Sequence, residues 1–148
     1  SILFFLQKEL SKKDLCLFIS IQITAAILGT IFANYIFGLS IVEISSNIRS
    51  GTNIYISEIF ASFGLLMVIL LSKVGGKNIV AFNVGIYITT AIIFTSSASF
   101  ANPAVSIARI FTESFAGINP STVIFFIGSQ VIGMFGAYFL YNRLFKTK

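Results

Sequence analysis

Four long apolar stretches most strongly constrain what this chain can fold into. They cover residues 15–37, 54–71, 79–97 and 123–141, to within a few residues at each end. A helix that crosses the hydrocarbon core of a bilayer needs about 20 mostly apolar residues. Apolar residues make up 56% of the 148 residues and charged ones only 10%, which leaves too little polarity to cover a soluble domain. The sequence therefore predicts an all-α membrane protein with about four transmembrane helices.

The basic residues predict how these spans are oriented. With four spans, both ends of the chain and the loop between the second and third spans share one side of the membrane. That side carries eight of the ten basic residues: Lys8, Lys12, Lys13, Lys73, Lys77, Arg143, Lys146 and Lys148. The positive-inside rule assigns it to the cytoplasm. We therefore expect a multi-pass protein with a cytoplasmic C-terminus, embedded in a lipid bilayer.

The composition also argues against several classes of chemistry. The chain has no histidine, and its single cysteine cannot form an internal disulfide. The carboxylates are scattered singly, so we expect neither a membrane enzyme nor a metal or other cofactor. The net charge of +5 does not come from a basic stripe interleaved with aromatic residues. We therefore expect no nucleic-acid partner.

The segment 103–115, between the third and fourth spans, is apolar but too short to cross a membrane. Asn102 is a good N-cap, and Pro103 suits the first position of a helix. A helix that begins inside a bilayer leaves its first N–H groups without partners. Such backbone is tolerated only when it is buried in protein or lines a watery cavity. The pattern indicates a pore; the alternative is a simple turn between two spans.

The run Asn102-Pro103-Ala104 at the start of a short helix resembles the signature of the aquaporin and glycerol-facilitator family, the major intrinsic proteins. The strings SSASFANPAVSIARIFTESFAGI, SEIFASFGLLMVI and VAFNVGIYITTAIIFTSSASF are similar to bacterial aquaporins found beside arsenic-resistance genes. The similarity runs from about residue 15 to residue 145. It implies an aquaporin-like bundle with a re-entrant half-helix carrying the second Asn-Pro-Ala motif. It also implies a bacterial inner-membrane protein that forms a homo-oligomer, a tetramer in this family.

Members of that family consist of two inverted repeats, each with three spans and one half-helix. Aligning Gln22 with Gln130 predicts one partial domain over residues 1–148. Within it, residues 1–37 would end the first repeat, 38–53 would form an extracellular loop, and 54–148 would form the second repeat. The first two spans and the first Asn-Pro-Ala motif would then be missing. We expect an N-terminally truncated chain: a fragment, a natural truncation, or a chain completed by a partner.

The resemblance also implies roles for individual residues. In the pore motif, Asn102 would orient the solute, Pro103 would set the helix start, and Ala104 would allow close stacking of the opposite loop. The selectivity filter would consist of Thr90, Ser99 and Val105. Val105 stands where most of the family has an arginine, and loss of the guanidinium would widen the filter and suit larger neutral solutes. The alternative for each filter residue is simple packing.

Four further residues would support the pore. Glu58 is the only carboxylate within a span, and it matches a glutamate that binds the Asn-Pro-Ala loop through backbone N–H groups. The alternative is that Glu58 faces water at the outer interface. Gln22 and Gln130 match glutamines that bind loops or helices across the bundle. Arg109 would place positive charge near the pore mouth, or would snorkel outward or pair with Glu113.

Five glycines within the spans predict close contacts between helices. They are Gly29, Gly64, Gly85, Gly133 and Gly136. The expected function is that of a passive transmembrane channel, or a component of one, for small neutral solutes such as water, glycerol or neutral metalloid hydroxides. The alternative is a truncated, non-conducting or scaffold subunit of a membrane assembly.

Overall fold

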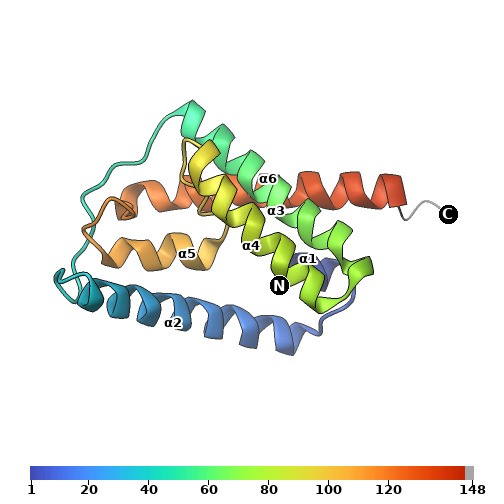
Figure 1. Ribbon diagram of the computed structural model, residues 1–148, viewed down its shortest axis with the longest axis horizontal. Helices are drawn as coiled ribbons and strands as arrows, with labels where there is room; N and C mark the ends of the chain where they lie inside the picture. Colours follow the sequence, from blue (N-terminus) through green and yellow to red (C-terminus); the bar gives the residue numbers. More distant parts are fainter. Residues whose placement is uncertain (146–148) are drawn as a thin grey trace. The chain divides into compact units, whose positions relative to one another are not determined.

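A computed structural model describes residues 1–145, and within that range the chain is helical, with no strand (Figure 1). The helices are α1 (Ile2–Leu6), α2 (Lys12–Ile36), α3 (Thr52–Ser72), α4 (Lys77–Phe94), α5 (Pro103–Ala108) and α6 (Pro120–Phe145). Single turns of 3-10 helix follow α3 at Lys73–Gly75 and α5 at Arg109–Phe111. Lys146 and Lys148, counted above for orientation, lie outside the described residues.

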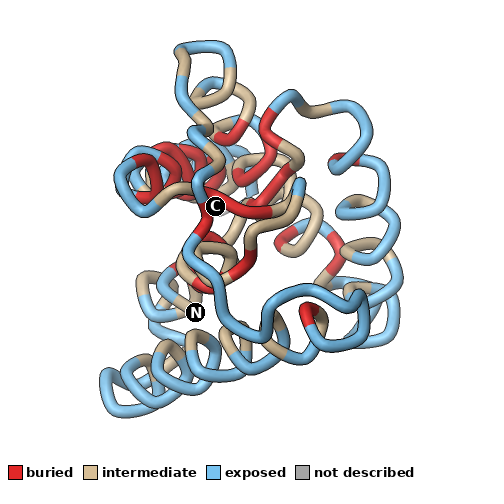
Figure 2. Tube along the Cα trace, turned by 90° about the vertical axis from the view of Figure 1, so that its left-hand side faces the viewer, coloured by how far each residue is buried: buried red, intermediate tan, exposed pale blue. Residues whose placement is uncertain are grey.

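Within residues 1–145, four helices are long and apolar enough to cross a membrane, which confirms the predicted number of spans. They are Lys12–Ile36, Thr52–Gly75, Lys77–Phe94 and Pro120–Phe145. Figure 2 shows that buried positions are few along the trace, and α2 has Asn34 as its single buried residue. Large exposed apolar side chains over whole helices are costly in water and favourable in lipid.

The bounds of the spans differ from the prediction by a few residues, because caps rather than hydropathy set them. The hydroxyl oxygen of Ser11 accepts a hydrogen bond from the Asp14 backbone N–H at 3.1 Å, so α2 begins at Lys12. The side-chain oxygen of Asn119 accepts from the Ser121 N–H at 3.0 Å, just before α6. The helix α4 ends at Phe94, three residues earlier than predicted, where the chain enters an irregular loop.

The helix α2 ends in a Schellman motif. The Leu39 N–H donates to the Asn34 carbonyl at 2.9 Å, and the Gly38 N–H donates to the Tyr35 carbonyl at 3.2 Å. Gly38 takes the left-handed conformation that this motif requires, with φ +67°. The turn stops α2 and directs the chain into the loop that leads to α3.

The chain divides into two compact units that interleave along the sequence. The first unit combines Ser1–Arg49 with Pro103–Ile124, and the second combines Ser50–Asn102 with Phe125–Lys148. The first therefore holds α1, α2 and α5, and the second holds α3, α4 and most of α6. The division into a first and a second repeat, which is sequential, stays a prediction.

Glycines bring helices of the second unit close together. A Cβ at Gly64 would lie 2.3 Å from the Tyr87 hydroxyl, and one at Gly133 would lie 2.4 Å from the Ile59 carbonyl oxygen. A Cβ at Gly136 would lie 3.3 Å from the Phe63 ring. These three glycines are contact points, as the sequence predicted.

The same prediction is wrong for two other glycines. Among the described residues, a Cβ at Gly29 or Gly85 would meet nothing within 4 Å. Both are exposed on the surfaces of their helices, so no neighbouring helix needs the space that the missing side chain leaves.

Candidate pore site

The loop between α4 and α5 has an unusual backbone. Ala98, Ser99 and Ala101 all have positive φ, at 59°, 45° and 47°. The left-handed conformation costs an ordinary L-residue roughly 1–2 kcal/mol because its Cβ crowds the following carbonyl oxygen. Three such residues in a row of four persist only when the surroundings hold them in place.

Helix α3 provides part of that support. The Ser97 N–H donates to the Ser57 hydroxyl at 3.4 Å, and the Ser96 hydroxyl donates to the Asn53 carbonyl at 3.5 Å. At the next residue of α3 after Ser57, Oε1 of Glu58 accepts a hydrogen bond from the Ala101 N–H. The loop is therefore bound along one side of α3, up to the residue that precedes Asn102.

Glu58 is fully buried, which excludes the alternative that it faces water at the outer interface. Its Oε1 also accepts a hydrogen bond from Nε2 of Gln130 in α6 at 3.1 Å. A buried carboxyl group is costly unless hydrogen bonds compensate for the lost water. One oxygen from α3 thus binds both the loop and the last span.

An aromatic contact joins the same loop to α6. The rings of Phe100 and Phe126 have centroids 5.1 Å apart, and both residues are buried. Phe126 also meets the Tyr55 ring of α3 edge-on, with centroids 6.3 Å apart. Apolar packing therefore holds the residue before Ala101 while Glu58 holds the Ala101 backbone.

The short helix α5 begins at Pro103, directly after Asn102, where the sequence predicted a helix start. It is shorter than the predicted segment 103–115, because the 3-10 turn ends at Phe111 and Thr112 is extended. Nine helical residues at about 1.5 Å each reach roughly half-way across a hydrocarbon core of about 30 Å. Ala104 is buried, whereas Asn102 and Pro103 are half-buried.

The last carbonyl groups of this short segment find partners outside it. The Ile110 carbonyl accepts from the Ser45 N–H at 2.8 Å, and the Phe111 carbonyl accepts from Nδ2 of Asn34 at 2.9 Å. The Arg109 carbonyl accepts from the Ile118 N–H at 3.2 Å. Helix ends otherwise leave such carbonyls unsatisfied. This pairing explains how so short a helix is held.

Residues 41–49 and 110–119 form what we call the clasp, two loop segments joined by hydrogen bonds. Nδ2 of Asn47 donates to the Ser114 carbonyl at 2.6 Å, and Nε of Arg49 donates to the Gly117 carbonyl at 2.8 Å. Sequence reasoning missed the clasp. The one available signal was the polar run around Asn47 in an otherwise apolar loop.

Glu113 belongs to the clasp, and the alternative that it pairs with Arg109 stays a prediction. The carboxylate of Glu113 accepts from the Ser46 N–H at 2.6 Å and also from the Ser46 hydroxyl. These hydrogen bonds lower the pKa of Glu113 below its ordinary value. The side chain turns toward the 41–49 loop because that loop supplies two donors from one residue.

The filter candidates lie in different surroundings. Thr90 is exposed on α4, Ser99 is buried in the strained loop, and Val105 is half-buried on α5. Thr90 and Ser99 belong to the second unit and Val105 to the first. Their meeting in one filter stays a prediction.

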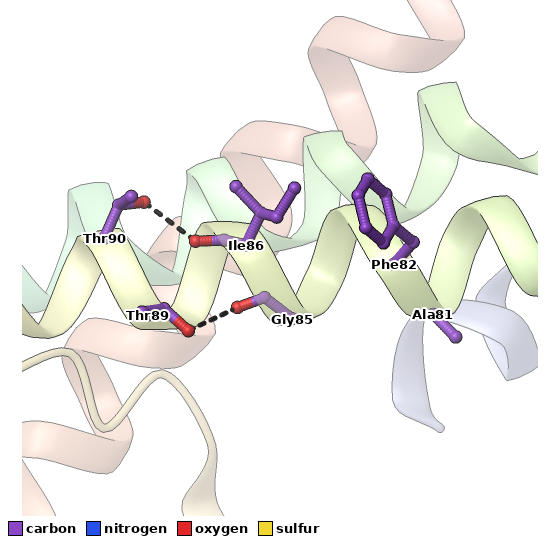
Figure 3. A pocket seen from close by; sticks show the side chains of 6 residues that line it. All are labelled: Ala81, Phe82, Gly85, Ile86, Thr89 and Thr90. Atoms are coloured by element: carbon purple, nitrogen blue, oxygen red, sulfur yellow. Dashed lines mark hydrogen bonds between the residues drawn. The ribbon is translucent and has the colours of Figure 1, made fainter.

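A shallow hollow lies along α4 beside Thr90 (Figure 3). It is lined by Ala81, Phe82, Gly85, Ile86, Thr89 and Thr90. The Thr90 hydroxyl donates to the Ile86 carbonyl at 3.0 Å, and the Thr89 hydroxyl donates to the Gly85 carbonyl at 2.9 Å. With their protons used within the helix, these hydroxyls offer acceptors to the hollow. Sequence reasoning named Thr90 for the filter and Gly85 for a helix contact, and did not group them, although Ala81, Gly85 and Thr89 share one face at spacing four. The filter role of Thr90 stays a prediction.

Gln22 lies on α2, in the first unit. Its Nε2 donates to the Ser1 hydroxyl at 2.9 Å, so it joins α2 to the start of α1. This bond lies in the first unit, whereas Gln130 binds Glu58 in the second. The two glutamines that the sequence paired as repeat equivalents thus each bind another element within their own unit.

Comparison with known proteins gives one clear relative. The chain is 38% identical over 133 residues to the aquaglyceroporin AqpS of Rhizobium meliloti (strain 1021). The match covers 90% of this chain and 57% of the relative, so the chain spans little more than half of that protein's length. No family model matches the chain, and no solved structure matches it.

The matched region must contain the whole candidate site. Because 133 of 148 residues are aligned, at most 15 can lie outside at either end, and residues 16–133 are always included. The aligned region therefore includes Glu58, the α4 hollow and the start of α5 at Pro103. The four apolar helices and this 38% identity support the aquaporin family of major intrinsic proteins as the family of this chain.

Proposed function

We propose that this chain forms part of the wall of a passive channel for small neutral solutes. The observation that carries the proposal is the hydrogen bond from the Ala101 N–H to buried Glu58, which fixes the residue before Asn102 within a membrane protein. Solute would move down its own gradient, without covalent chemistry. The aquaglyceroporin relative supports this class of solute.

In this proposal Asn102 offers amide donors to a passing water or hydroxyl group. Pro103 fixes the start of α5. Ala104 is buried, and its small side chain leaves room for the opposite loop of the pore to stack closely. Glu58 and Gln130 are positioning residues that hold the loop from α3 and α6. Gln22 holds α1 against α2 in the first unit.

The proposed solutes are larger than water, with glycerol and neutral metalloid hydroxides as candidates. Val105 brings no guanidinium to the filter, so neither a strong donor nor a fixed positive charge narrows it. Thr90 adds a small hydroxylated side chain beside the open space at Gly85. Ser99 is equally small. Together these side chains favour a wide, mildly polar passage.

The proposed setting is the inner membrane of a bacterium, with the C-terminus in the cytoplasm and four chains in a homo-oligomer. Lys73 and Lys77, between the second and third spans, favour a cytoplasmic position for that turn. The clasp then lies on the outer side. Arg109, beside the clasp, would place positive charge near the outer mouth of the channel.

Stopped-flow light scattering tests the proposal. Vesicles containing the chain should re-swell faster than empty vesicles in a gradient of glycerol, and should also respond faster to an impermeant osmolyte that drives water. Asn102→Asp should reduce both rates, because a carboxylate in place of the amide removes its N–H donors. Rates equal to those of empty vesicles would instead favour a non-conducting subunit.

A further inference from the structure

The loop that follows α2 has its polarity inverted relative to a loop in water. Its apolar side chains point outward, with Ile48 70% exposed, and the neighbouring Phe115 is 92% exposed. Its serine at position 45 is only 1% exposed. We call the outward set the interfacial face; it comprises Ile41, Val42, Ile44, Ile48 and Phe115, all classed as exposed.

Several polar groups of this region are bound within the clasp, whereas the Glu43 carboxylate is exposed. Arg49 donates to the carbonyls of Phe115 and Gly117, and the Glu113 carboxylate accepts from Ser46. Asn47 donates to the Ser114 carbonyl. The interfacial face is therefore backed by polar groups already bound to one another, an arrangement that suits an apolar exterior.

The depth of the clasp follows from α2. Its 25 residues span about 37 Å at 1.5 Å each, more than a hydrocarbon core of about 30 Å. Lys12 and Lys13 hold its first turn at one water boundary, so its last turn lies at the opposite boundary. The exposed Tyr35 in that turn is of a type enriched at this level.

Asn34 fixes both limbs of the clasp at the level of that last turn. Its buried Nδ2 donates to the Ile41 carbonyl at 3.1 Å and to the Phe111 carbonyl at 2.9 Å. The backbone at both residues therefore lies beside the end of α2 rather than above it in solvent. Ile36 and Phe37, exposed at 61% and 78%, continue the apolar surface of the span into the loop.

We propose that the clasp rests in the boundary between headgroups and acyl chains of the bilayer, with the interfacial face against phospholipid. Continuity with the lipid-facing end of α2 favours lipid over a second copy of the chain as the occupant. Exposed contiguous apolar surface marks a membrane or protein contact rather than a free surface, and interfacial apolar side chains sink into this boundary layer. The clasp thereby becomes a membrane-bound rim beside α5.

The absence of tryptophan from the chain permits a direct test. Ile48→Trp and Phe115→Trp each introduce a single fluorophore at an exposed site, where a larger ring meets little resistance. Ile21→Trp, at a 53% exposed position near the middle of α2, reports the membrane interior. Val74→Trp, 96% exposed between Lys73 and Gly75, is the matched apolar control in a cationic turn.

In phosphatidylcholine vesicles, we expect the clasp variants to emit at shorter wavelength than the Val74 variant. Nitroxide lipids labelled near the headgroup should quench them more than deep-labelled lipids do, and aqueous iodide should quench them least. Ile21→Trp should show the opposite depth preference. Circular dichroism of each variant reports whether the helices are kept.

Two outcomes would overturn the proposal. Long-wavelength emission with strong iodide quenching would place the interfacial face in water. Short-wavelength emission that neither iodide nor nitroxide lipids quench would show a protein surface over it, a second copy included. The measurement needs no transport, so an inactive channel and an unbound clasp give different results.

Discussion

At the scale of single residues, Glu58 has the largest structural role. Its Oε1 accepts from the Ala101 backbone and from Gln130, and it has no contact with water. The span that carries it was evident from hydropathy. The family resemblance predicted that Glu58 binds the Asn-Pro-Ala loop, but it did not pair Glu58 with Gln130. No local pattern encodes partners that lie 43 and 72 residues away.

Substitutions at Glu58 should differ in their effect on stability according to whether they keep a hydrogen-bond acceptor. Glu58→Leu leaves the Ala101 N–H without an acceptor, a loss of about 1–3 kcal/mol of stability. Glu58→Gln keeps an amide oxygen and should lose less. The midpoint of thermal unfolding in detergent should fall further for Glu58→Leu than for Glu58→Gln. Glycerol flux should also fall further for the leucine variant. Equal losses for both variants would show that the acceptor oxygen does not hold the loop.

Val105 is the residue at which selectivity should be adjustable. Val105→Arg adds donors and bulk to the proposed filter, and should lower the glycerol-to-water flux ratio by about tenfold, equivalent to an added barrier of about 1.4 kcal/mol. Val105→Ile, which adds one methylene, is the control and should change the ratio little. A ratio unchanged by arginine would place Val105 away from the solute path.

At the scale of elements, glycines divide into those that touch another helix and those that do not. Gly64→Ala would place a methyl 2.3 Å from the Tyr87 hydroxyl, which donates to the Ala61 carbonyl at 2.9 Å. Overpacking of this kind costs about 1–3 kcal/mol. We expect a lower midpoint of thermal unfolding.

Gly29→Ala is the matched control for that substitution. Nothing among the described residues lies within 4 Å of the added methyl, and alanine favours a helix over glycine by up to about 1 kcal/mol. The midpoint of thermal unfolding should therefore be unchanged or higher. A similar fall in both variants would show that the lack of space at Tyr87 does not cause the loss of stability.

The clasp should loosen in acid. Two hydrogen bonds from Ser46 lower the pKa of Glu113, so its charged form is favoured in the folded clasp. The resulting stability is present above the ordinary carboxyl pKa of about 4.5 and is lost as pH falls through the lowered pKa. Hydrogen exchange at the Ser45 and Ser46 amides, corrected for the intrinsic rate, should accelerate over that range.

Two variants check the source of this pH dependence. Glu113→Gln should exchange at the acid rate at every pH. Glu43→Gln changes an exposed carboxylate in the same loop and should keep the wild-type response. Loss of the response in the Glu43 variant, or its persistence in the Glu113 variant, would assign the titration to another group.

The spans were predictable at this scale because burial in lipid demands length and apolarity, and both are local properties. The clasp was not. Asn34 meets Phe111 across 77 positions and Ser46 meets Glu113 across 67, so tertiary folding alone brings them together. The early end of α4 was missed because Thr95 and Ser96 read as a continuation of the apolar stretch.

At the scale of the whole molecule, orientation in the membrane is the property most open to test. The Lys73–Lys77 turn should be cleaved by trypsin in inverted inner-membrane vesicles and protected in right-side-out ones. The reason is the charge bias, which places basic turns in the cytoplasm. The reverse pattern of cleavage would show that the protein has the opposite orientation, with the clasp on the cytoplasmic side.

The bond network of Glu58 has a consequence for biosynthesis. Residues leave the ribosome in order, so α3, carrying Glu58, and the strained loop both emerge before Gln130 does. Until α6 enters the bilayer, that loop lacks its packing against Phe126, and Glu58 lacks its hydrogen bond from Gln130. This loop is therefore fully supported only after α6, which follows it in the chain, has been made.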